Sequence, residues 1–99
     1  MRHRPIMEAD MKIRKGFVLE EVGDSFLACA TGKLAREFSG FIKMNETGAF
    51  LWRALSSGDK TEDELVAAML GEYDISESIA RADVSAFVAN LRANKILED

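Results

Sequence analysis

The order of apolar and polar residues divides the chain into a first half that favours strands and a second half that favours helices. Phe17–Val22 and Ser25–Ala30 are rich in strand-forming residues, and Gly23-Asp24 between them suits a two-residue type II′ hairpin turn. These two strands are therefore expected to pair in an antiparallel manner. Phe38–Met44 alternates with the period of a half-buried strand, so we predict a third strand there.

The hairpin carries an apolar set on each face, and the pattern alone does not decide which set faces the core. A shift of one residue in register exchanges the two faces. One set comprises Phe17, Leu19, Phe26 and Ala28. The other set comprises Val18, Val22, Leu27 and Cys29.

The third strand is approached through Thr31–Glu37, which is polar and uneven and is expected to form a connecting loop. Within the strand, Ile42 and Met44 are expected to face inward. Gly40 has no side chain to pack, so it marks either a bulge or a place where another backbone comes close.

The first predicted helix begins directly after the third strand. Asn45 is a favoured N-cap residue, and Glu46 suits the positive end of a helix. The apolar stripe of this helix comprises Gly48, Leu51, Trp52 and Leu55. Trp52 is thus expected in the core rather than stacked on a ligand. Phe50 lies off the stripe and is either covered by a neighbouring element or exposed for a partner.

Two further helices are predicted in the second half. Thr61 and Glu64 have the spacing of a capping box, and Ser76 suits the N-cap of the third helix. The second helix should bury Leu65, Ala68, Met69 and Tyr73. The third should bury Ala80, Val84, Phe87, Val88 and Leu91. The third helix is expected to run to about Asn94, and Asn94 is expected to adopt the left-handed C′ conformation. Ile96-Leu97 should then fold back onto the core.

Length and composition indicate one soluble globular domain. The chain has 99 residues, of which 47% are hydrophobic and 30% charged, with a single Pro. Residues 1–10 show little periodicity and are expected to form a flexible extension, which leaves 11–99 as the domain. Three strands followed by three helices, with no strand-helix-strand repeat, predict an α+β fold in which a small antiparallel sheet packs beside a helical bundle.

The chain is expected to stay in the cytoplasm. Cys29 is the single cysteine and lies in an apolar run, so it is interpreted as a small buried hydrophobe rather than a reactive thiol, which fits a reducing compartment. The longest apolar runs are too short to cross a bilayer, and Met1–Met7 lacks the apolar region of a secretory signal.

Neither an enzyme nor a metal site is predicted. The single His3 has no second histidine and no nearby cysteine, and no glycine-rich nucleotide-binding motif is present. The acidic cluster Glu62-Asp63-Glu64 is explained by its place at a helix start. We therefore expect no catalytic residue, no metal and no cofactor. A formal charge of -4 argues against a general nucleic-acid binder and favours peptide or protein partners.

Several short motifs in this order and spacing resemble the PqqD-like family, small domains that hold a precursor peptide for a partner enzyme. The resemblance covers the chain from about Met11 to its end. Its motifs are Gly40–Trp52, Thr61–Leu65, Glu72–Asp74, Ala80–Val84 and Leu91–Leu97. It implies a winged helix-turn-helix arrangement in which the second and third helices form the turn. Asn45–Ala49 and Asn94–Leu97 look more like the wider set of PqqD-like proteins than like those of pyrroloquinoline quinone biosynthesis.

The resemblance also implies a peptide-binding groove between the third strand, as an edge that accepts an added strand, and the third helix. The strand would contribute Ser39, Gly40, Phe41, Ile42, Lys43 and Met44. The helix would contribute Ile79, Ala82, Asp83, Ala86 and Asn90. Phe41 would offer an apolar contact and Lys43 a charge that selects an acidic leader. Ala82 and Ala86 either leave room for peptide side chains or merely let helices pack closely.

Two functions are consistent with these observations. The first is a non-catalytic module that captures the leader of a ribosomally made precursor peptide by β-strand addition and presents it to a modifying enzyme, often a radical S-adenosylmethionine (radical SAM) protein in this family. The second is a winged-helix DNA-binding or dimerising transcription regulator, since a fold does not fix a function. The third helix offers only Arg81 and Arg92 as positive charges. We therefore favour the peptide module, with no nucleic-acid or membrane partner, as a monomer or weak homodimer.

Overall fold

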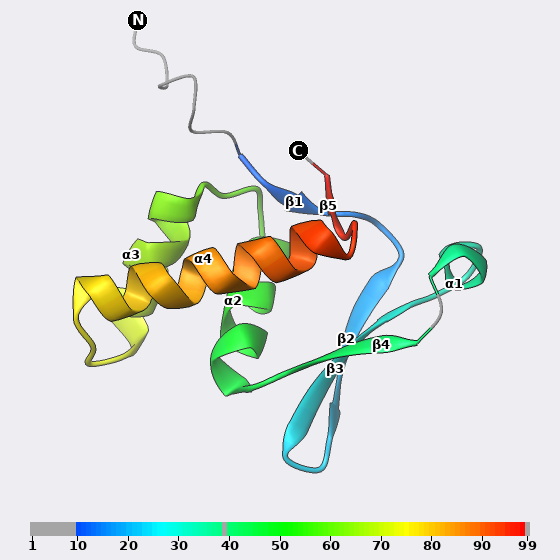
Figure 1. Cartoon of the computed structure of the whole chain (residues 1–99), viewed down its shortest axis with the longest axis horizontal. Helices are drawn as coiled ribbons and strands as arrows, with labels where there is room; N and C mark the ends of the chain where they lie inside the picture. Colours follow the sequence, from blue (N-terminus) through cyan, green and yellow to red (C-terminus); the bar gives the residue numbers. More distant parts are fainter. Residues whose placement is uncertain (1–9, 39, 99) are drawn as a thin grey trace, which may run out of the picture.

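The computed structural model describes residues 10–38 and 40–98, and these form an α+β domain (Figure 1). The predicted flexible extension, apart from Asp10, lies outside the described residues. Helices α2, α3 and α4 lie together on one side, and the sheet of β2, β3 and β4 extends from them on the other. In chain order the elements are β1 (Lys12–Ile13), β2 (Phe17–Val22), β3 (Ser25–Ala30), α1 (Leu34–Glu37), β4 (Phe41–Met44), α2 (Glu46–Ser56), α3 (Glu62–Glu72), α4 (Glu77–Ala93) and β5 (Leu97–Glu98).

The three predicted strands form one antiparallel sheet in the order β2-β3-β4, as expected. Val22 pairs with Ser25, so Gly23-Asp24 is the two-residue turn. Gly23 has a φ of 62°, the left-handed value that a type II′ turn requires at its first central position. The predicted hairpin is therefore confirmed.

Packing against the helices decides which face of the hairpin is buried. Leu19, Ala28 and Ile42 form a cross-strand row, and Ala28 and Ile42 belong to the buried core. Phe17 and Leu19 pack against the same core, whereas Val18 and Val22 are exposed. Cys29 lies on the outer face with these valines and is half-buried, so its predicted full burial was wrong.

A second, two-stranded sheet of β1 and β5 was not predicted from the sequence. Ile13 pairs with Leu97, and Met11 exchanges backbone hydrogen bonds of 2.7 and 3.2 Å with Lys60. A strand of two residues is too short to show an alternation of apolar and polar residues. These strands are therefore recognised only from their pairing in the folded structure. Ile96 and Leu97 are buried, which confirms that the chain folds back after α4.

The connection before β4 contains the short helix α1 rather than loop alone. Phe38, at its end, packs edge-to-face on Phe17 with ring centroids 5.1 Å apart. Gly40 has a φ of 90°, and a Cβ added there would meet no atom within 4 Å. Gly40 thus serves the turn that leads into β4, and no other backbone approaches it closely. Strand β4 begins at Phe41, so it is shorter than predicted.

All three predicted helix starts are confirmed. The Asn45 side chain accepts a hydrogen bond of 2.8 Å from the Gly48 backbone N–H at the start of α2. Thr61 and Glu64 form the reciprocal capping box of α3. The Ser76 hydroxyl accepts from Ile79 at 3.3 Å at the start of α4. Each side chain satisfies a backbone donor that would otherwise have no partner within its helix.

The buried faces of the helices follow the sequence pattern closely. Trp52 is in the core, and Phe50 is covered by Tyr73, with ring centroids 5.5 Å apart. The predicted face of α4 is buried in full: Ala80, Val84, Phe87, Val88 and Leu91. In α3, Leu65 and Met69 are buried as predicted, Ala68 is only half-buried, and Val66 is buried in addition. Tyr73, which follows the end of α3, is also only half-buried.

The left-handed residue after α4 is Lys95 and not Asn94, which corrects the prediction. Asn94 has a φ of -96°, whereas Lys95 has a φ of 59°. Ile96 donates to the Leu91 carbonyl at 2.9 Å and Lys95 to the Arg92 carbonyl at 3.1 Å, the bonds of a Schellman motif. Burial of the Ile96 side chain fixes this register, although Asn tolerates the left-handed conformation better than Lys does.

No helix in the described part of the chain is long and apolar enough to cross a membrane. Over the same residues, no group of three or more His, Cys, Asp or Glu side chains is placed to hold a metal ion.

Candidate functional site

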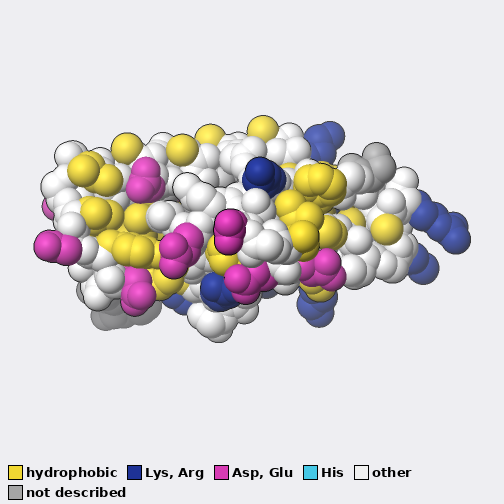
Figure 2. Space-filling model, turned by 90° about the horizontal axis from the view of Figure 1, so that it is seen from below, with side chains coloured by type: hydrophobic (Ala, Val, Ile, Leu, Met, Phe, Trp, Pro, Cys, Tyr) yellow, Lys and Arg dark blue, Asp and Glu magenta, His cyan; other side chains and the backbone are white. Residues whose placement is uncertain are grey.

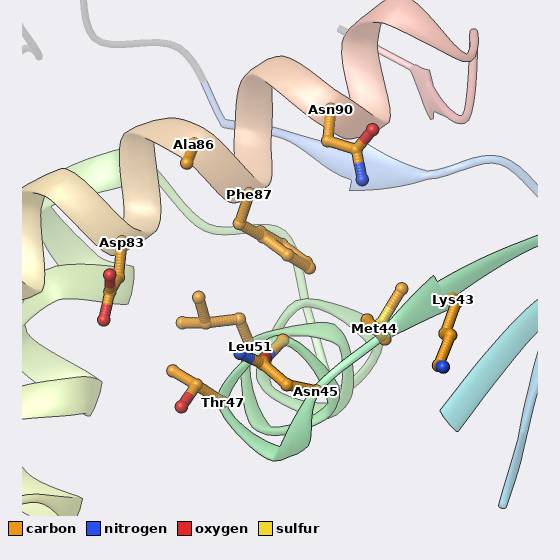
Figure 3. Close-up of a pocket in the computed structure, with 10 residues that line it drawn as sticks. Lys43, Met44, Asn45, Thr47, Leu51, Asp83, Ala86, Phe87 and Asn90 are labelled. Carbon is orange, nitrogen blue, oxygen red and sulfur yellow. The ribbon is translucent and has the colours of Figure 1, made fainter. Parts of the chain in front are cut away.

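An open groove lies between the edge strand β4 and helix α4, and the start of α2 closes one side of it (Figure 3). Its volume is about 310 Å³, which is within the range of ligand-binding pockets. Five residues predicted for a peptide site line it: Lys43, Met44, Asp83, Ala86 and Asn90. The structure therefore brings the predicted strand and the predicted helix together around one cavity.

The other predicted site residues lie outside the lining. Phe41 is 60% exposed on the outer face of the sheet, and Ile42 points into the core. Gly40 precedes β4 and does not contact the cavity. Ile79 and Ala82 are exposed near the start of α4, before Asp83. Ser39 lies outside the described residues.

The first turn of α2 contributes lining residues that the sequence did not reveal as site residues. Asn45, Thr47 and Gly48 follow β4 immediately, so the capped start of the helix closes one side of the groove. Leu51 and Phe87 also line it and were assigned to the core only. Both side chains are buried in the core and also form part of the cavity surface. The helical spacing of apolar residues predicts the first role but not the second.

Strand β4 has one unpaired edge within the described residues. It pairs with β3 on one side, and no other described strand pairs with it. An unpaired edge offers backbone N–H and C=O groups to an added strand. Strand β2 is the other edge of the sheet, but none of its residues lines the groove.

The floor of the groove is apolar and firmly held. Leu51 is 1% exposed, and Phe87 belongs to the same core cluster, with Met44 packed against that cluster. Ala86 is exposed on the α4 wall and has only a methyl group, so it leaves the cavity open. Such a floor can receive a large apolar side chain without much rearrangement.

The rim is polar, and its two charges stand at opposite ends. Figure 3 shows Asp83 at the end toward the start of α4 and Lys43 at the end toward the sheet. Both side chains are exposed, and neither forms an ion pair with another described residue. In the view of Figure 2, acidic side chains gather over the helical half of the molecule, while basic side chains stand out at the end that carries α1.

Tyr73 lies beside the groove through its contact with Thr47. Burial raises the pKa of the Tyr73 hydroxyl, and the nearby carboxylates of Glu46 and Glu72 raise it further. A hydrogen bond with the Thr47 side chain lowers the pKa in part. The hydrogen bond with Tyr73 thus links the Thr47 side chain, which lines the groove, to the residue after α3.

Comparison with known families supplies the identification. The sequence model of the family described as Coenzyme PQQ synthesis protein D (PqqD) matches residues 30–97. The chain belongs to the PqqD family. The predicted resemblance is thus confirmed, and the matched part of this PqqD-family chain includes both walls of the groove.

Two solved structures share the fold of this PqqD-family chain. One is described as TbiB1 in complex with the TbiA(beta) leader peptide, with a TM-score of 0.68 and 22% identity over 88% of this chain and 94% of that one. The other is a lasso peptide synthetase B1 complexed with the leader peptide, with a TM-score of 0.69 and 18% identity over 92% of this chain and all of that one. A search of curated proteins found no match.

Proposed function

We propose that this chain is a non-catalytic module that binds the leader segment of a ribosomally synthesised precursor peptide and presents it to a modifying enzyme. The observation that carries the proposal is the groove itself, in which an unpaired strand edge faces a helix across an apolar floor. Membership of the PqqD family supports it. The two similar folds, both described with bound leader peptides, give it further support.

The leader would bind by adding a strand to the free edge of β4. Main-chain hydrogen bonds to β4 would supply part of the affinity, and side chains that enter the groove would supply selectivity. A dissociation constant near 1 μM corresponds to about 8 kcal/mol. A short strand with one or two buried apolar anchors can reach this value after the cost of ordering the peptide.

The partner in this proposal is a peptide-modifying enzyme. A radical SAM protein, implied by the family resemblance, stays a prediction, and the description of one similar structure names a lasso peptide synthetase instead. The module itself would need no metal and no cofactor. We place the module in the cytoplasm, where precursor peptides are made. We expect it to be a monomer or a weak homodimer.

The alternative of a DNA-binding regulator receives less support from the charges on α4. Arg81 is held by Asp63 at 2.9 Å and by Glu77 at 3.0 Å, so binding a phosphate would require it to leave two carboxylates. The hydrogen bonds to these carboxylates raise the pKa of Arg81 above its already high usual value. This leaves α4 with little free positive charge for a duplex.

A backbone-amide titration with the leader of a candidate precursor peptide from a neighbouring short gene tests the proposal. Chemical shifts should move in β4, in the first turn of α2 and along the groove side of α4. The matched pair of variants is Ala86→Arg, which places a long charged side chain in the groove, and Ser85→Arg, which places the same side chain on the other side of α4. Ser85 is exposed and lies outside the groove, so both variants should stay folded.

Ala86→Arg should weaken binding at least tenfold, about 1.4 kcal/mol, because the new side chain occupies the cavity. Ser85→Arg should bind as the unchanged protein does. Equal affinities of the two variants, or shifts confined to β2 and α3, would mean that the peptide binds elsewhere and would refute the proposed site.

A further inference from the structure

The backbone of β3 bonds its two neighbouring strands at alternate residues, as in every antiparallel sheet. Thr31, directly after β3, donates to the carbonyl of Gly16, directly before β2, at 2.7 Å. The backbone groups of Thr31 therefore point toward the β2 side. Every second residue back along β3 points the same way, so the residues between them, Ala28 and Phe26, point toward β4.

This alternation determines which backbone groups of β4 are left at its free edge. The β4 partners of Ala28 and Phe26 are Ile42 and Met44, so these two residues use their backbone groups in pairing with β3. Phe41 and Lys43 alternate with them, and their N–H and C=O groups point away from β3. Main-chain hydrogen bonds to an added strand are thus made by Phe41 and Lys43.

The side chains of the same two residues lie on the outer face of the sheet. Ile42 between them is buried in the core, and successive side chains of a strand point to opposite faces. Phe41 is 60% exposed beside Cys29. Lys43 is exposed beside Leu27 and forms no ion pair with another described residue. The free edge therefore offers an apolar surface and a positive charge, separated by one residue.

The sheet also determines the order in which a bound peptide meets these two side chains. All pairings in the three-stranded sheet are antiparallel, and sheets of a single pairing type are favoured over mixed ones. In an antiparallel strand, the residue opposite Lys43 comes two positions before the residue opposite Phe41. Directly opposite residues place their side chains on the same face, with Cβ atoms about 5 Å apart.

We propose that β4 selects leader segments in which an acidic residue stands two positions before a large apolar residue, with both side chains on the outer face of the sheet. This inference rests on the peptide-binding function proposed above. The acidic residue pairs with Lys43 and the apolar residue with Phe41, and both hydrogen-bond to β4 through their backbones. The residue between them faces the groove side of the sheet, on which Met44 lines the cavity.

A selection of random strand-length peptides displayed on phage tests the pattern. The protein is used unchanged, as Lys43→Glu, and as the control Lys33→Glu, which makes the same charge change at an exposed position outside the groove. A second pair is Phe41→Ser and Val18→Ser. Val18 lies in the same cross-strand row as Phe41 but on β2, away from the free edge of β4. Peptides that depend on the groove are recognised by their loss of binding to Ala86→Arg.

Groove-dependent peptides selected on the unchanged protein and on Lys33→Glu should carry Asp or Glu two positions before a large apolar residue. Those selected on Lys43→Glu should carry Lys or Arg at the first position. Synthetic peptides with Glu or Lys there should differ about fivefold in dissociation constant on the unchanged protein, about 1 kcal/mol, with the preference inverted on Lys43→Glu. Phe41→Ser should weaken binding about fivefold, and Val18→Ser should leave it unchanged.

Backbone methylation of a selected peptide tests the register without changing any side chain. An N-methyl group on the acidic or the apolar residue removes a hydrogen bond to β4, so binding should weaken at least tenfold. The N–H of the residue between them points away from β4. Methylation there should therefore weaken binding less than threefold.

The outcomes separate this inference from the function on which it rests. The inference would be overturned by groove-dependent peptides that lack the acidic and apolar pair or carry it in the opposite order, by a preference that Lys43→Glu does not invert, or by equal losses at all three methylated positions. Each of these results would leave the peptide-binding function intact. A selection in which no enriched peptide loses binding to Ala86→Arg would count against the peptide-binding function itself, and the inference would fall with it.

Discussion

At the scale of single residues, the groove is made by side chains that serve two purposes. Asn45 caps α2 and also lines the cavity, and Leu51 and Phe87 fill the core and also form the groove floor. Substitutions of these residues would change stability and binding together. Ala86, Lys43 and Asp83 are exposed, so they are the positions at which binding can be altered without loss of the fold.

Tyr73 offers a direct measurement at this scale because it is the single tyrosine of the chain. Its hydroxyl should ionise with a midpoint above 10.0, since burial and then Glu46 and Glu72 oppose the phenolate. The folded state binds this proton more tightly than the unfolded state does. The resulting stability is present below pH about 10 and is lost as the pH rises through the folded pKa.

An absorbance titration of the phenolate, in native buffer and in urea, measures the shift directly. The native midpoint should exceed the midpoint in urea. Glu46→Gln should lower the native midpoint without abolishing the difference, because burial is the larger cause. A native midpoint at or below the one in urea would contradict the structure around Tyr73.

At the scale of elements, each of the three long helices begins at a capping side chain that the sequence displays. The capping box of α3 is the most complete, because Thr61 accepts from the Glu64 backbone at 3.1 Å and Glu64 accepts from the Thr61 backbone at 2.9 Å. Thr61 is also buried, which makes water a poor substitute for its hydroxyl. The start of α3 therefore depends on this cap.

Thr61→Ala should lower the free energy of unfolding by about 1–2 kcal/mol, whereas Thr61→Ser should retain most of it because the hydroxyl is kept. Urea unfolding of both variants measures the two losses. Ser76→Ala at the more exposed cap of α4 serves as the comparison and should cost less, since its bond is longer, at 3.3 Å. Equal losses for Ala and Ser at position 61 would show that packing of the methyl group, and not the cap, is what matters.

At the scale of the whole molecule, one face of the sheet packs against the core, and the edge of β4 that no described strand pairs with lies beside α4. The ends of the domain close together through β1 and β5, so the helices and the sheet are held as one body around the groove. The net charge of -4 and the acidic side chains over the helical half oppose approach to a polyanion. This charge distribution favours the proposed peptide partner over nucleic acid.

Duplex DNA should bind weakly and only at low salt. Few phosphate contacts are available, because Arg81 is already held by Asp63 and Glu77. Fluorescence anisotropy with random and genomic-fragment DNA, at low salt and at about 0.15 M salt, measures this. Sub-micromolar binding that survives the higher salt would favour the regulator function over the peptide module.

Local sequence signals predicted most of the elements. Caps are local chemistry, so Asn45, Thr61 and Ser76 could be recognised without the fold. The period of 3.6 residues predicted the buried face of α4, and the Gly23-Asp24 turn predicted the hairpin. Both walls of the candidate groove came from the family resemblance and from exposed small residues on α4, and residues of each line the cavity.

Only the tertiary structure decided what depends on partners distant in sequence. The inward face of the hairpin was fixed by its packing on the helices, because both faces are apolar. Strands β1 and β5 exist through their pairing with each other, and Lys95 rather than Asn94 became left-handed because burial of Ile96 fixed the end of α4. Likewise the groove arises where β4, α2 and α4 meet. No local pattern in the sequence predicts that these three elements come together.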